Sequence, residues 1–316
     1  MVTASKSTSS AKKRHRRPRR VRWMSNPKLM AGLILVIFFL LVIAAHPVFH
    51  NTIWDREFRV YDPAIGYDAR VIHPSGPSAD HWLGTDSLGR DVVSMFTFSA
   101  RYSVVVALVA GLTIGVVSLL FGSIAAYRKG WVDSLITHFS DAMVFLPAIL
   151  AVWIIGIGAD SSSFGALEVG ITFGILYGLG PATATVRASA MSVMAKPFID
   201  AARLAGAGMT RTVTRHMLPH LVPHAAVQAM IGIAGAVTAE AFLAYRSGVG
   251  ANIGFGYLVF EGLTFGELFS GVLNIPWWVM ITGAMGITLL AGAFYLIGVG
   301  LREVFDPHSL DPRSVD

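Results

Sequence analysis

The sequence predicts an all-α, polytopic membrane protein, and three observations support this fold class. Of the 316 residues, 54% are hydrophobic and only 14% are charged, whereas a soluble domain normally carries about a quarter charged residues. The apolar residues gather in runs near the length of about 20 residues that a helix needs to cross a bilayer. Thirty-two glycines are typical of helices that pack closely in lipid.

Six apolar runs are predicted to be transmembrane helices. They cover residues 29–49, 103–126, 139–158, 164–187, 224–245 and 278–300. Six crossings place every dense Lys/Arg segment on one side, and basic flanks mark the cytosolic side. Both termini are therefore expected in the cytosol. In the third run, Pro147 is expected to kink the helix.

The chain divides into four predicted regions. Residues 1–28 carry ten Lys and Arg and no acid, and they are expected to form a disordered cytosolic tail that contacts anionic lipid. A nucleic-acid-binding arm and a cleaved signal peptide are the alternatives. We expect no nucleic-acid partner, because a membrane span follows directly. Residues 29–100 hold the first span and an outer-face segment, residues 101–302 the main transmembrane domain, and residues 303–316 a cytosolic tail.

Several kinds of chemistry have no support in the sequence. The chain has no cysteine, which rules out disulfides and thiolate chemistry. Its ten histidines show no metal-ligand spacing, and no G-x-x-x-x-G-K-[ST] segment could hold ATP. No pair of residues suggests a nucleophile and its base. We therefore expect no catalytic residue, no metal site and no cofactor in this chain.

The segment 200–219 lies between apolar runs yet carries several charges, so it is expected to lie in water with helices of its own. Pro197 suits a first helical turn because its missing N–H would be unpaired there, and the Asp200 carboxylate complements the helix dipole. Gly206 and Gly208 are expected to end this helix in a left-handed cap.

A second short helix is expected to run to about Met217, where Pro219 stops it. Small residues, Ala201, Ala202 and Ala205, give the first helix a face with little bulk, which another protein could approach closely. The alternative is an amphipathic helix that packs on its own bundle.

This segment resembles the EAA loop of binding-protein-dependent ABC importer permeases. An acid, two alanines, a glycine and a Leu-Pro pair recur at the family's spacing, with Asp in place of the commoner Glu. The matching residues are Asp200, Ala201, Ala202, Gly206, Leu218 and Pro219. The resemblance implies that residues 187–223 form a coupling loop, whose helix docks in a groove of an ATPase subunit.

A second motif stands before the second span, in the sequence HWLGTDSLGRDVVSMFTFSARYS of residues 81–103. Taken alone, it predicts an interfacial lead-in helix with tight glycine turns. The segment also resembles the H-x-LGTD-x-x-GRD-x-x-S element of permeases for dipeptides, oligopeptides and nickel. The matching residues are His81, Leu83, Gly84, Thr85, Asp86, Gly89, Arg90, Asp91 and Ser94, with Arg101 after them.

The resemblance covers nearly the whole chain after the basic tail, with two departures. His138 occupies a position where the family usually has Arg. The segment 246–276, expected to be an outer loop, lacks the family's usual Leu-Gly-Leu-Gly pattern, and Pro276 begins the return to that pattern.

Three acids lie in or near predicted spans, namely Asp141, Glu168 and Glu240. Acids inside a membrane are costly and suggest function, and a proton- or sodium-coupled secondary transporter would use them. Structural roles near helix ends are the alternative. Such carriers often show inverted repeats with broken helices at matching positions, and the sequence shows none.

The resemblance implies a type I ABC importer transmembrane fold in the bacterial cytoplasmic (inner) membrane. It further implies a permease subunit that pairs with a second, homologous permease. Two ATPase subunits would carry the ATP and magnesium, and an extracytoplasmic solute-binding protein would deliver the substrate. Di- or oligopeptides are the expected substrate, with nickel or another small solute as the alternative. A secondary transporter and a structural membrane scaffold are the rival classes.

Overall fold

We describe the protein from a computed structural model, which describes residues 26–48, 60–159, 164–244, 253–269 and 276–305. The predicted basic tail therefore lies outside the described residues except for its last three positions. The C-terminal tail from residue 306, and parts of the predicted outer loop at 245–252 and 270–275, also lie outside them.

The described chain is helical, and within it the only β-type pairing is one isolated bridge between Thr85 and Asp91. Two segments, η4 and η5, are wider π-helical turns inside longer helices. The elements in chain order are α1 (Pro27–Val48), α2 (Val92–Arg128), α3 (Gly130–Phe145), α4 (Ala148–Gly158), α5 (Ala166–Tyr177), η4 (Gly178–Ala182), α6 (Thr183–Met194), α7 (Pro197–Leu204), α8 (Met209–Arg211), η5 (Thr212–Met217), α9 (Leu218–Ala244), α10 (Phe255–Phe269) and α11 (Trp277–Phe305).

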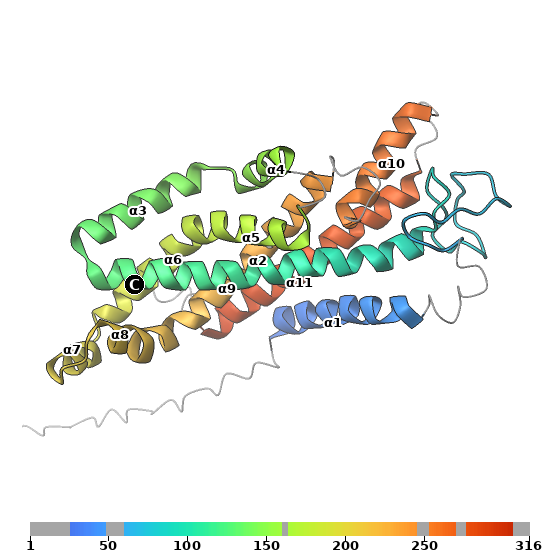
Figure 1. Ribbon diagram of the computed structural model, residues 1–316. Coiled ribbons are helices and arrows are strands. Elements are labelled where there is room, and N and C mark those ends of the chain that lie inside the picture. Colours follow the sequence, from blue (N-terminus) through green and yellow to red (C-terminus); the bar gives the residue numbers. More distant parts are fainter. Residues whose placement is uncertain (1–25, 49–59, 160–163, 245–252, 270–275, 306–316) are drawn as a thin grey trace, which may run out of the picture.

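The helices form an elongated bundle with two different ends (Figure 1). Helices α7 and α8 lie at one end, and α10 lies at the other with the coil of residues 60–91. We call these the α7 end and the α10 end. Central α2 packs against α5, α6 and α9, and α11 packs against α1, α9 and α10. The start of α1 lies beside the end of α11, where the Asn26 amide donates to Glu303 (2.9 Å) and Lys28 forms an ion pair with the same carboxylate.

Five continuous helical stretches are long and apolar enough to cross a membrane, and a sixth crossing is possible through a bent pair. The pair is α3 and α4, which meet at an angle of 81°. The break falls at Leu146 and Pro147, as predicted from Pro147. The fold thus agrees with six crossings, but the third span is broken rather than continuous.

The structure adds a second break that the sequence analysis did not predict. Beside the α3–α4 break, η4 interrupts the next span at Pro181, and Gly180 has non-helical backbone angles (φ −87°, ψ −111°). The hydroxyl of Ser140 donates to the carbonyl of Gly180 (2.8 Å), which satisfies a group that the break releases. These breaks lie in consecutive spans, so they do not form the distant matching pair of an inverted repeat.

One further sequence prediction was wrong, and one segment contains a helix that was not predicted. Pro219 does not stop a helix, because η5 runs directly into α9 and α9 continues to Ala244. The wider π-turn before Pro219 accommodates a residue that lacks the N–H of a regular helical bond. The predicted outer loop contains the 15-residue helix α10. Its Gly256 and Gly262 lie against the backbones of Ala241 and Met280, so close packing in the bundle outweighs their low helix propensity.

Candidate functional site

Helix α7 projects from the end of the bundle with most of its surface exposed. Lys196 lies in an extended conformation before the helix, and Pro197 occupies its first turn. Gly206 has a φ of 80°, as predicted, and its N–H bonds to the carbonyl of Arg203 (2.9 Å). Gly208 has an ordinary φ of −69° and instead precedes α8. The glycine end-cap therefore rests on Gly206 alone.

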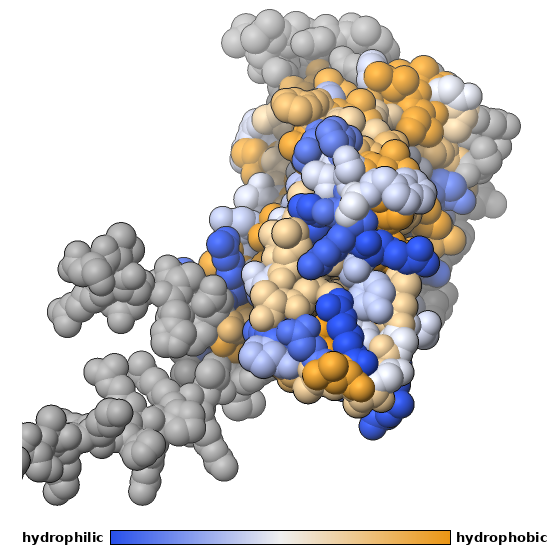
Figure 2. All heavy atoms as spheres, turned by 90° about the vertical axis from the view of Figure 1, so that its left-hand side faces the viewer, coloured by the Kyte–Doolittle hydropathy of each residue, from blue (hydrophilic) through white to orange (hydrophobic). Residues whose placement is uncertain are grey.

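The predicted small face of α7 is accessible. Asp200 and Ala201 are exposed, and Ala202 is half-buried. Leu204 is 90% exposed, an unusual position for a large apolar side chain next to charged neighbours. Figure 2 views this end of the molecule, where hydrophilic residues gather around scattered apolar ones. No buried side chain covers this face within the described part of the chain.

One fully buried residue anchors α7 to the bundle, and the ring of Phe198 adds a contact with His220 of α9 (ring centroids 5.6 Å apart). Ile199 is the only fully buried residue of α7, and it packs in a cluster with Met194 and Met217. Arg203 adds a weaker contact, with its guanidinium 5.6 Å from the centre of the Tyr127 ring. Asp200 lies 3.7 Å from Arg203, an exposed pair of small energetic value. The helix is thus fixed at one edge, and its opposite face is exposed as far as the described residues show.

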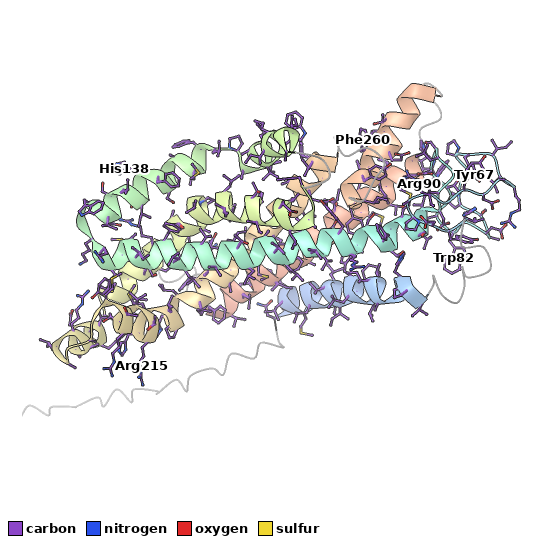
Figure 3. All side chains as sticks on the ribbon, viewed as in Figure 1. Tyr67, Trp82, Arg90, His138, Arg215 and Phe260 are labelled. Carbon is purple, nitrogen blue, oxygen red and sulfur yellow. The ribbon has the colours of Figure 1, made fainter. Side chains whose placement is uncertain are left out.

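Leu218 and Pro219 close the motif at the start of α9. Leu218 is half-buried and Pro219 is exposed. Arg215, on η5, points outward from the same end of the molecule (Figure 3). The structure therefore brings all six motif residues to the α7 end, but it does not collect them around a single pocket.

At the α10 end, the first half of the second motif, residues 81–91, folds as a compact turn, and its second half is helical as the start of α2 rather than as a separate lead-in helix. Gly84 and Gly89 have φ of 76° and 88°. The Asp86 carboxylate accepts from the backbone N–H of Leu88 (3.0 Å) and Arg90 (2.7 Å). Asp91 caps α2, since its carboxylate accepts from the N–H of Ser94 (2.8 Å). These bonds are a direct reason for Asp at both positions.

Arg90 joins this turn to α10. Its side chain is 1% exposed and lies where the coil meets α2 and α10 (Figure 3). Its Nε donates to Asp86 (2.6 Å), and its Nη2 donates to the Tyr257 hydroxyl (3.1 Å). The Glu261 carboxylate lies 3.4 Å from the same nitrogen, and burial raises the pKa of Glu261 to about 7. We call Asp86, Arg90, Tyr257 and Glu261 the arginine cluster.

A second buried group surrounds His81. Its Nδ1 lies 2.9 Å from Asp91 and its Nε2 lies 3.4 Å from Asp68. The bond to the Asp91 carboxylate raises the pKa of His81 above its usual value, and Asp68 acts in the same direction. Bonding to Arg70 lowers the pKa of Asp68 to about 2. The His81 ring between two carboxylates therefore ties the coil to the start of α2.

Thr85 and Arg101 complete the motif residues. The Thr85 carbonyl accepts from the indole N–H of Trp278 (3.0 Å), which links the turn to α11. Arg101 lies on an exposed part of α2, apart from the two clusters. The sequence motif did not reveal Asp68, Tyr257 or Glu261, because they lie outside it. Asp68 is 13 residues before His81, and Tyr257 is 167 residues after Arg90.

The three acids near the spans have different surroundings. Glu240 is buried in α9, where its carboxylate accepts from the Ser103 hydroxyl (3.0 Å) and from the N–H of Gly256. It thus holds the start of α10 against α2 and α9. Glu168 is exposed in the first turn of α5 and accepts from the N–H of Gly165 (2.9 Å), as a helix cap does. Asp141 is exposed on α3.

Comparison with known proteins supplies the family. Residues 118–309 match the family described as binding-protein-dependent transport system inner membrane component. The dipeptide transport system permease protein of Bacillus subtilis is 26% identical over 295 residues, which cover 90% of this chain and 83% of that protein.

Two other relatives have similar coverage. The oligopeptide transport system permease protein of Bacillus subtilis is 26% identical over 91% of this chain and 88% of its own length. The glutathione transport system permease protein of Pectobacterium atrosepticum is 29% identical over 92% of both chains. The family match covers more than half of the chain and contains both the broken spans and the α7 loop. The chain therefore belongs to the family of binding-protein-dependent transport system inner membrane components, as a multi-pass permease component of the cytoplasmic membrane.

Proposed function

We propose that this chain is one permease subunit of an ATP-driven ABC importer that carries di- or oligopeptides. The family supports transport that depends on a binding protein. Relatives that align over most of their length are named for dipeptide, oligopeptide and glutathione transport, and glutathione is itself a small peptide. ATP hydrolysis then belongs to separate ATPase subunits, with their ATP and magnesium, and an extracytoplasmic solute-binding protein delivers the peptide.

The observation that carries this proposal is the exposed face of α7. A large apolar side chain at 90% exposure, Leu204, lies beside the small residues Ala201 and Ala202 on a helix with one buried anchor. A helix of this kind can insert into a groove of another protein by its uncovered face. We assign the ATPase subunit as that protein, which places the α7 end in the cytosol together with both termini.

A second, homologous permease completes the pathway. One chain carries one α7 loop, whereas two ATPase subunits need two docking helices. The α3–α4 break supports the same arrangement. The N–H groups of Ala148, Ile149 and Leu150 begin α4 without a capping side chain, and Phe145 beside them is 87% exposed. Non-helical backbone at membrane depth must be covered by protein or face water, so this side faces the partner permease or the pathway between them.

The experiment adds bulk to the α7 face in the full transporter. In Ala202→Trp and Gly206→Asp, we expect normal membrane insertion, less ATPase subunit co-purifying with the permease, and slower uptake of a labelled dipeptide. Gly206 has open space around it, so the Asp variant strains a left-handed backbone position without an internal clash.

The matched control is Thr288→Trp, which adds the same bulk at an exposed position on α11, outside the loop of residues 187–223. It should leave both ATPase retention and uptake near wild type. Normal retention and uptake in both α7 variants would remove α7 from coupling. Equal loss of inserted permease in the α7 variants would instead assign the loop to folding.

A further inference from the structure

A polar groove lies between α6, α9 and α11. Its volume is about 380 Å³, within the range of about 300–1,000 Å³ typical of small-molecule sites. Polar side chains from three helices line it, with apolar groups at Val227 and Phe305. The lining polar residues are Thr185, Ser189, His224, Gln228 and Arg302.

The groove is basic, and its cation has no counterion among the described residues. Arg302 forms no ion pair within that part of the chain, and no acidic residue lines the groove. The neighbouring acid, Glu303, is already bonded to Asn26 and Lys28 on the α1 side. A guanidinium is always charged and presents donors in a planar fork that fits a phosphate. The groove therefore complements an anion.

In the groove, the hydrogen-bond donors and the hydrogen-bond acceptors available to a ligand come from different residues. The hydroxyls of Thr185 and Ser189 donate to carbonyls of their own helix, at 2.9 and 3.2 Å. They keep only lone pairs, which can accept from a ligand hydroxyl. Arg302, His224 and the Gln228 amide are left as N–H donors toward the anion. A ligand with a phosphate and free hydroxyls would satisfy both sets.

The position of the groove identifies the source of that ligand. Arg302 lies in the last turn of α11 and His224 lies two turns into α9, so both are near the α7 ends of their spans. Lipid headgroups lie at this level, and basic pockets between transmembrane helices hold anionic headgroups. Apolar Val227 and Phe305 can contact the first methylenes of a lipid chain.

We propose that this groove binds the headgroup of an anionic phospholipid, with phosphatidylglycerol as the best match. Arg302, His224 and Gln228 hold its phosphate, and Thr185 and Ser189 accept from its glycerol hydroxyls. The lipid joins α11 to α6 and α9, the two helices that flank the α7 loop. This inference concerns a face of the bundle separate from α7, and it does not depend on which solute is transported.

The test measures the lipid that stays with the full-length permease in its assembled transporter. The transporter is reconstituted in phosphatidylcholine vesicles that contain a minority of phosphatidylglycerol. It is then extracted in mild detergent, and the phosphatidylglycerol that co-purifies is quantified by mass spectrometry. Arg302→Gln should weaken retention about fivefold, the change expected from removing one basic residue near a membrane surface. His224→Gln should weaken it less.

Lys129→Asn is the matched control. It removes one positive charge from the same end of the molecule, and Asn accepts the φ of 47° that Lys129 adopts. Retention should stay at the wild-type level in this variant. An excess of inorganic phosphate should not displace the lipid, because the free anion lacks the glycerol and chain contacts.

Four outcomes would overturn the proposal. One is equal phosphatidylglycerol retention in wild type and Arg302→Gln at equal recovery of folded transporter. Another is retention of phosphatidylcholine as strong as that of phosphatidylglycerol in the wild type. The third is displacement by inorganic phosphate, which would assign the groove to a free anion. The fourth is a cross-link from position 302 to the partner permease that excludes lipid, which would assign the groove to the interface between the two subunits.

Discussion

The two ends of the bundle are built by opposite means. At the α10 end, a coil of about thirty residues (60–91) is held by buried charged groups, and Arg90, Asp86 and His81 are almost without solvent contact. At the α7 end, an eight-residue helix has one buried residue, and its Leu204 is almost fully exposed. Among the described residues, the buried side-chain nitrogens and oxygens at the α10 end have hydrogen-bond partners, apart from Nη1 of Arg90, Oε1 of Glu261 and, near the start of α2, the hydroxyl of Ser99.

This contrast distinguishes residues that stabilise the fold from residues that are free to bind another protein. A buried charge with internal partners contributes to a fixed structure, and losing one member leaves the others buried and unpaired. An exposed apolar helix face contributes little to the folded chain. Mutations at the α10 end should therefore change stability, whereas mutations on α7 should change association.

The largest expected effect is at Arg90. Arg90→Met should destabilise the permease by about 3–5 kcal/mol, because Asp86 and Glu261 would stay buried without their cation. Thermal unfolding of the purified full-length protein measures this effect. Arg101→Met is the matched control on exposed α2 and should change stability by no more than about 0.5 kcal/mol. Similar losses for both variants would contradict the role of the arginine cluster.

A smaller effect is expected from the buried acid Glu240. Glu240→Ala removes the acceptor for Ser103 and Gly256 and should cost about 1–3 kcal/mol, the usual penalty for leaving buried donors unpaired. Glu168→Ala removes only an exposed helix cap and should cost about 0.5–1 kcal/mol. Both values come from thermal unfolding in the same detergent. A larger loss for Glu168→Ala would reverse the structural assignment of the two acids.

The α10 end should also respond to pH. A His81 pKa that is higher in the folded state gives stability that is fully present below the unfolded value of about 6.5. That stability is lost as pH rises through the folded pKa. The midpoint of thermal unfolding should therefore fall as pH rises above about 6.5, and the fall should be smaller in His81→Gln. An unchanged pH dependence in His81→Gln would exclude His81 as its source.

Glu261 affects stability in a different pH range. Its folded pKa of about 7 lies above the usual carboxyl value, so ionisation is more costly in the folded state and stability falls between about pH 4.5 and 7. Glu261→Gln should remove the slope in that range while leaving the slope above it. Scanning both variants against pH distinguishes the two clusters.

Much of the fold was accessible from sequence because the apolar runs are long and their breaks contain proline. Pro147 predicted the bend between α3 and α4 correctly, and Gly206 was correctly expected in a left-handed conformation. The apolar runs in the sequence could not predict α10, because glycines inside a segment indicate a loop. In the structure these glycines allow close packing against the backbones of α9 and α11. The helix end predicted at Pro219 was wrong for a similar reason. A π-turn in the preceding residues accommodates the proline, so the helix continues through it.

The two candidate sites also differ in how much of each could be predicted from the sequence. The motif around Gly84 and Arg90 marked the turn, but its partners Asp68, Tyr257 and Glu261 come from distant segments that only folding brings together. The α7 motif was complete in the sequence because its residues are local. Its docking role and the sidedness of the chain remain predictions, since they concern a partner and a membrane.

The most direct test of the contrast is the accessibility of a single cysteine on α7, which the cysteine-free chain permits. Leu204→Cys and Ile72→Cys place thiols at positions that are 90% and 92% exposed, at the α7 and α10 ends respectively. In intact cells, a membrane-impermeant thiol reagent should label position 72 and not position 204. In inside-out membranes, position 204 should be labelled without the ATPase subunits and protected when they are bound. Labelling of position 204 from outside, or labelling that is indifferent to the ATPase subunits, would contradict the account.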